Sequence, residues 1–321
     1  MAGLTRLQDL LSDVSLLINE LHVKGFMSKK YAPLAIAYDF DGTLAAGNMQ
    51  EYDFIPALKM TSAEFWEEVK NLAANQEADE ILAYMHLMLE KAKATHVPVR
   101  RSDFQNFGAS IELFPGVLDW FDRIDQYGRS KGCKIEHFII SSGIREMIEG
   151  TKIRSKFKKI YGSGFMFDHN GVAHWPAVAM NYTTKTQFLF RINKGSLDVH
   201  DNSVINRFIP KEDRAVPFEN IIFIGDGITD VPCMRLVKDQ GGHAIAVYNS
   251  RKKGAKEVAT KLVEEGRASL TVPANYTADS AIERAVFAMI DKVSATERIG
   301  RPTRQKPTLI PAINPLQDLT E

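Results

Sequence analysis

The sequence is poor in cysteine: Cys133 and Cys233 are the only two in 321 residues. Two cysteines are too few for a disulfide framework or for a cysteine-based zinc site. Such scarcity is typical of proteins from a reducing compartment, so we expect a cytoplasmic location. The histidines show no paired spacing of the kind that binds metal, so we expect them to be structural or surface residues.

Long apolar runs are also missing. No uninterrupted apolar segment approaches the length of about 20 residues that spans a membrane, and the N-terminus has no basic stretch followed by an apolar stretch and a small-residue cleavage site. Lys and Arg together number 40, as do Asp and Glu, and the basic residues do not form one long run. We therefore expect no nucleic-acid or membrane partner, and a small molecule as the ligand.

An acidic turn follows the first apolar strand of the sequence. Asp39-Phe40-Asp41-Gly42-Thr43 comes directly after the apolar run 34–38. A carboxylate at the end of a parallel strand can point into the crevice where open α/β sheets bind ligands. Asp39 is thus a candidate nucleophile, and Asp41 can serve as general acid and base. An ordinary turn would favour the same Asp and Gly residues, so this segment alone does not decide.

Two further predicted strands end in residues suited to phosphate chemistry. The strand 138–140 leads into Ser141-Ser142-Gly143, and the strand 221–224 leads into a loop with Asp226 and Asp230. Because the ends of parallel strands converge on one crevice, these carboxylates and those of the first turn can share a hard, oxygen-liganded cation. Without one they would repel each other strongly, so we expect Mg²⁺.

A bound phosphoryl group also needs positive charge around its oxygens. Lys185 lies at the predicted start of a helix through 188–190, where the helix N-terminus adds its own attraction for anions. Lys194 is a rival for this role. The sequence does not decide between the two lysines.

Apolar strands alternate with helical patterns along most of the chain, which predicts a three-layer α/β core with a parallel sheet. Residues 46–112 read as an all-helical insertion between the first strand and the rest of the sheet. The core would comprise 1–45 and 113–295. It includes an amphipathic helix over 4–21, whose apolar face either packs on the core or forms a homodimer contact.

Two further segments have other patterns. Residues 164–175 read as a β-hairpin turned by Asn170-Gly171, and we expect this hairpin to be scaffold. Residues 296–321 have little periodicity and are rich in Pro, Thr, Gln and Arg. We expect an extended or disordered tail there.

Taken in chain order, these motifs resemble those of the haloacid dehalogenase superfamily of aspartate-nucleophile phosphohydrolases. The segment 39–43 resembles the first motif, 140–143 the second and 225–230 the fourth, while Lys185 is similar in placement to the lysine of the third. The insertion over 46–112 is similar to the small helical cap of phosphoserine phosphatase-like members.

The resemblance implies a Rossmann-like core and a Mg²⁺-dependent phosphatase. Asp39 would form an aspartyl-phosphate with a small phosphorylated metabolite, and Asp41 would act first as acid and then as base. The implied metal ligands are Asp39, the backbone carbonyl of Asp41, Asp226 and Asp230. The implied phosphate-binding residues are Thr43, Ser141, Ser142, Gly143 and Lys185. Two alternatives stay open: a phosphotransferase or mutase that uses the same aspartate, and a catalytically retired binding protein.

Overall fold

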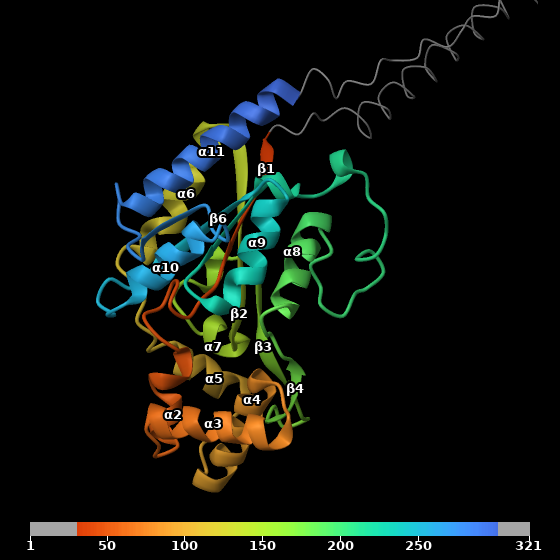
Figure 1. Cartoon of the computed structure of the whole chain (residues 1–321). Coiled ribbons are helices and arrows are strands. Elements are labelled where there is room, and N and C mark those ends of the chain that lie inside the picture. Colours follow the sequence, from red (N-terminus) through yellow and green to blue (C-terminus); the bar gives the residue numbers. More distant parts are fainter. Residues whose placement is uncertain (1–30, 301–321) are drawn as a thin grey trace, which may run out of the picture.

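A seven-stranded sheet forms the centre of the molecule in the computed structural model, which describes residues 31–300 (Figure 1). The strands lie in the order β4-β3-β2-β1-β5-β6-β7. Their bounds are β1 Ala32–Tyr38, β2 Cys133–Ile144, β3 Lys159–Phe167, β4 Ala173–Val178, β5 Ile221–Gly225, β6 His243–Tyr248 and β7 Leu270–Pro273. Every neighbouring pair is parallel except β3 and β4. The α/β class is thus confirmed, and the predicted hairpin is present as well: β3 and β4 form an antiparallel pair at the sheet edge, where a short turn reverses the chain.

Helices cover both faces of this sheet. Their bounds are α6 Val117–Ser130, α7 Arg145–Glu149, α8 Thr184–Lys194, α9 Val231–Asp239, α10 Ala255–Glu264 and α11 Ala281–Gly300. In β1, Leu34 and Ile36 pack into the apolar cluster that contains α6 and α11, whereas Ala35 and Ala37 pack into the cluster of α8, α9 and α10. Figure 1 shows α6 and α11 on one side of the sheet and α8 on the other. This alternation explains why β1 is apolar at almost every position.

Residues 46–112, which we call the cap, contain helices and no named strand, and the structure describes this stretch throughout. Their bounds are η1 Met49–Glu51, α2 Phe54–Ala57, α3 Ser62–Gln76, α4 Glu80–Thr95 and α5 Arg101–Gly108. Thr61 caps α3 in a capping box with Glu64, and the side chain of Asp79 caps α4. Figure 1 shows these helices gathered at the end of the sheet where β1 stops. A role of the cap as a lid stays a prediction.

Two predicted boundaries were wrong. The strand β2 continues through Ser141 to Ile144, and its pairing with β3 shifts register between Ile140 and Ile144. The segment predicted to bind phosphate is therefore an irregular part of the strand and not a loop after it.

Helix α11 continues to Gly300, so the tail predicted from residue 296 does not begin there. Polar contacts hold this last turn: the side-chain amide of Asn220 donates to Oε1 of Glu297 at 3.3 Å. An apolar period alone could not reveal them. The predicted helix over 4–21 and the remainder of the predicted tail lie outside the described residues. Within 31–300, none of the helices combines the length and apolar character needed to cross a bilayer.

Candidate active site

Asp39 lies at the carboxyl end of β1, in the middle of the sheet. Its backbone N–H donates to the carbonyl of Ile224 in β5 at 2.8 Å, so the ends of the two strands are fixed side by side. The side chain is buried, with 5% of the residue exposed. This is the position where the strand order reverses between β2 and β5, the usual ligand site of a doubly wound sheet.

Lys185, in the first turn of α8, connects two of the predicted carboxylates. Its Nζ donates to Oδ1 of Asp39 at 3.0 Å and to Oδ1 of Asp230 at 2.7 Å, and the residue is only 1% exposed. Burial alone would lower the pKa of Lys185, but the carboxylates of Asp230 and Asp39 raise it above its ordinary value. The lysine therefore stays charged and holds both carboxylates in place.

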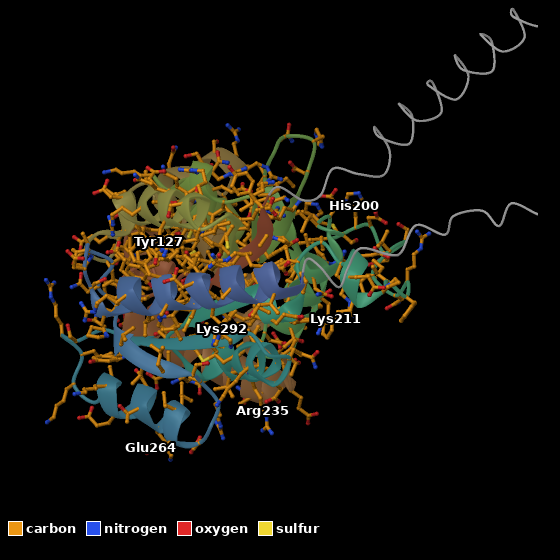
Figure 2. The ribbon with its side chains drawn as sticks, turned by 90° about the horizontal axis from the view of Figure 1, so that it is seen from above. Tyr127, His200, Lys211, Arg235, Glu264 and Lys292 are labelled. Atoms are coloured by element: carbon orange, nitrogen blue, oxygen red, sulfur yellow. The ribbon has the colours of Figure 1, made fainter. Side chains whose placement is uncertain are left out.

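Lys194, the rival lysine, lies at the other end of α8 and serves a different part of the chain. Its Nζ donates to the carbonyls of Ile205 at 2.6 Å and Arg207 at 2.8 Å. Both acceptors belong to the long connection after α8, the edge segment on which His200 and Lys211 lie in Figure 2. Of the two lysines, Lys185 is the one in the carboxylate cluster.

Asp226 and Asp230 complete a compact acidic group with Asp39. One carboxylate oxygen from each lies within 4.8 Å of the others. Burial, followed by the charge of Asp39, raises the pKa of both Asp226 and Asp230. Three carboxylates thus face one ammonium group, and this excess of negative charge fits a hard divalent cation that takes oxygen ligands.

Asp41 stands beside this group without joining it through its carboxylate. Its Oδ1 accepts a hydrogen bond from the backbone N–H of Met49 at 2.9 Å. Burial and the neighbouring charge of Asp39 raise the pKa of Asp41 well above its usual range. A carboxyl group that keeps its proton near neutral pH can act as a general acid.

The segment Ser141-Ser142-Gly143 lies at the neighbouring strand end. Ser141 is buried, and its Oγ accepts a hydrogen bond from the backbone N–H of Gly143 at 3.2 Å. The hydroxyl oxygens of Ser142 and Thr43 are buried and have no hydrogen-bond partner among the described residues. Buried hydroxyls normally have partners, so two free ones next to a charged cluster suit a site that binds an oxygen-rich ligand.

Two residues that the sequence did not single out support this segment. The carbonyl of Ser142 accepts hydrogen bonds from the hydroxyl of Tyr84 in the cap at 2.6 Å and from Oγ of Ser163 in β3 at 2.9 Å. Tyr84 occurs on a helix among apolar residues, and Ser163 inside a strand. Neither pattern carries a signal that distinguishes these residues from ordinary core residues.

A second contact joins the cap to the core at the start of α8. The side-chain amide of Asn181 donates to Oδ2 of Asp79 at 2.7 Å, while its Oδ1 accepts from the backbone N–H of Thr184. Asn181 thus binds the N-cap residue of α4 and also accepts a hydrogen bond from the first residue of the helix that carries Lys185. The cap helix α4 is fixed to the core at two places, both next to predicted site residues.

Comparison with known proteins agrees with this geometry. The sequence model of the haloacid dehalogenase-like hydrolases matches residues 36–235, a span that includes every predicted site residue. The chain belongs to the haloacid dehalogenase-like hydrolase family. It is 30% identical over 278 residues to a Borreliella burgdorferi protein described as uncharacterized, a match that covers 78% of this chain and 94% of that protein.

Two solved structures also match most of this chain. A HAD family hydrolase from Salmonella enterica serovar Typhi has a TM-score of 0.49 and 18% identity, over 80% of this chain and 74% of that one. A substrate-bound phosphoserine phosphatase has a TM-score of 0.48 and 12% identity, over 74% of this chain and 92% of that one.

Gly42 lets two motifs of this hydrolase approach each other. Its φ angle is +75°, in the left-handed region, and a β-carbon built on it would lie 1.9 Å from Oδ2 of Asp226. The Asp226 carboxylate therefore packs directly on the α-carbon of Gly42. Only glycine allows both this backbone conformation and this contact.

Proposed function

We propose that this hydrolase is a Mg²⁺-dependent phosphatase that acts on a small phosphomonoester through an aspartyl-phosphate on Asp39. The observation that carries the proposal is the buried contact of Lys185 with both Asp39 and Asp230. The hydrogen bond from Lys185 orients the carboxylate of Asp39 at the end of β1. Such an oriented carboxylate is what a nucleophile requires.

In the first half of the reaction, a carboxylate oxygen of Asp39 attacks phosphorus and the bond from phosphorus to the leaving-group oxygen breaks. Asp41 gives its proton to that oxygen, a role supported by its raised pKa. The ammonium of Lys185 and the hydroxyls of Thr43 and Ser142 are available to the phosphoryl oxygens. The product of this half is a free alcohol and the phosphorylated aspartate.

In the second half, water attacks the same phosphorus and the bond to Asp39 breaks. Asp41, now deprotonated, takes a proton from the attacking water and returns to its first state. Inorganic phosphate leaves the site. The same side chain therefore serves as acid and then as base within one turnover, and the proton that Asp41 gives to the leaving group is replaced by one from water.

The residues Asp39, Asp226 and Asp230, with the backbone carbonyl of Asp41, would hold Mg²⁺. When bound, the cation supplies charge neutralisation for the nucleophile and the phosphoryl group. The donor set is all oxygen, and it has more negative charge than Lys185 alone can balance. Both properties match the preference of Mg²⁺ for carboxylate ligands.

Removal of the metal tests this proposal. We expect EDTA to abolish release of phosphate from an aryl phosphate, because the carboxylate cluster would then repel the substrate dianion. Added Mg²⁺ should restore the activity and should also raise the melting temperature, since a ligand of the folded state stabilises it. Full activity in excess EDTA would contradict the proposed metal dependence.

The contact of Gly42 with Asp226 gives a second test. In Gly42→Ala the added methyl group must displace the Asp226 carboxylate, and we expect kcat/KM for an aryl phosphate to fall by about a hundredfold or more. Gly171→Ala is a matched control because Gly171 also has a φ angle of +75° but no atom within 4 Å of an added β-carbon. Equal activities of the two variants would show that the contact does not matter.

A further inference from the structure

Gln50 is unusual among the side chains of the cap. Across residues 46–112, all of which the structure describes, it is the one buried side chain that is neither apolar nor aromatic, with 2% of the residue exposed. The cap is otherwise stabilised by buried aliphatic and aromatic groups such as Phe65 and Met88. A lone polar side chain in such surroundings calls for a specific partner.

Within residues 31–300, the structure shows no such partner for its oxygen. Oε1 of Gln50 is buried and accepts no hydrogen bond from the described residues. A buried carbonyl oxygen without a donor destabilises the fold, because it has lost its water and gained nothing in exchange. The atom is therefore suited to a donor that arrives with a ligand.

Gln50 is next in the sequence to a residue that contacts the candidate site. It directly follows Met49, whose backbone N–H donates to Asp41, and the methyl group of Met49 lies 2.1 Å from the place of a β-carbon on Gly143. The short helix η1 thus packs between the first and second motifs. The hydroxyl oxygens of Thr43 and Ser142 in those motifs are likewise buried without a hydrogen-bond partner among the described residues.

We propose that Gln50 is a specificity-determining residue whose side-chain oxygen accepts a hydrogen bond from a hydroxyl of the leaving group. The inference rests on the proposed phosphatase function and names its substrate class: phosphomonoesters of neutral, hydroxylated alcohols. No charged side chain is buried anywhere in the fully described range 46–112. A carboxylate or ammonium on the leaving group would thus find no buried counter-charge in the cap, and its desolvation would oppose binding.

The experiment compares two esters, glycerol 3-phosphate and 4-nitrophenyl phosphate, whose leaving group has no hydroxyl to donate. In Gln50→Leu we expect the ratio of kcat/KM for glycerol 3-phosphate to that for the aryl ester to fall about tenfold or more. The wild-type enzyme should also prefer glycerol 3-phosphate to phosphoserine and phosphoethanolamine. Gln76→Leu is the matched control, because Gln76 lies exposed at the end of α3 in the same cap, and it should leave the ratio unchanged.

Thermal melting separates a binding role from a structural one. If Gln50 serves to bind a ligand, we expect the melting temperature of Gln50→Leu to be no lower than that of the wild type, because leucine removes a buried polar atom that has no hydrogen-bond partner. A lower melting temperature with equal losses on both esters would make Gln50 a structural residue and overturn the inference. If Gln50→Leu hydrolyses both esters with the same ratio of kcat/KM as the wild type, the inference about Gln50 is overturned but the proposed phosphatase function is not. Absence of hydrolysis by the wild type would overturn the proposed function and the inference with it.

Discussion

Asp39→Asn should reduce hydrolysis of an aryl phosphate by about a thousandfold or more. The amide cannot act as a nucleophile on phosphorus, and no other described carboxylate has both the strand-end position and the hydrogen bond from Lys185 that Asp39 has. The loss should appear in kcat, because the bond to phosphorus forms in the chemical step. Release of phosphate at saturating Mg²⁺ and substrate measures it directly.

The control for this change is Asp119→Asn. Asp119 lies exposed in the first turn of α6, so it undergoes the same chemical replacement outside the site. We expect it to retain full activity. Retention of more than about a tenth of the wild-type rate by Asp39→Asn would assign the nucleophile elsewhere, since removal of an attacking group has far larger effects. A normal melting temperature of the Asp39 variant would show that the loss is chemical.

Lys185→Met should lower both stability and activity. It leaves the carboxylates of Asp39 and Asp230 buried without their shared cation, and removal of one partner from a buried charge pair costs about 3–5 kcal/mol. For a chain of this size we expect the melting temperature to fall by roughly 10 °C. Melting in EDTA measures the effect without help from Mg²⁺, and phosphate release measures the loss of activity.

Lys194→Met provides the comparison, because the two lysines lie on the same helix. The Lys194→Met substitution removes the hydrogen bonds to the carbonyls of Ile205 and Arg207. We expect it to lower the free energy of unfolding by about 1–3 kcal/mol and to leave catalysis intact. Addition of Asp230→Asn to Lys185→Met should recover part of the lost stability, since it removes one uncompensated charge. The same stability in the two lysine variants would contradict the role that we assign to Lys185.

Much of the candidate site could be placed from strand ends. Asp39, Ser141 and Asp226 each follow an apolar run, and the topology of a parallel sheet brings such positions together whatever their separation in sequence. The α/β class followed from the same alternation of strands and helices. Lys185 was more difficult, because a lysine at a helix start is usually solvated, and the two carboxylates that contact it are distant in the sequence.

The remaining features depend on packing that has no period. Tyr84 reaches the carbonyl of Ser142 only because α4 lies across the strand ends, and Gln50 became distinctive only when its burial was known. The end of α11 is held by a polar contact with Asn220, which no apolar pattern predicts. Contacts between elements distant in the sequence therefore set the limits of what the sequence could reveal.

The side chain of Asn181 connects the cap to the helix that carries Lys185. Its amide N–H donates to Asp79 of the cap while its oxygen accepts from the first backbone N–H of α8, so the same side chain joins the cap to the helix of Lys185. Any movement of α4 away from the strand ends has to break the bond to Asp79. Movement of the cap and the position of the helix that carries Lys185 are therefore linked through this one side chain.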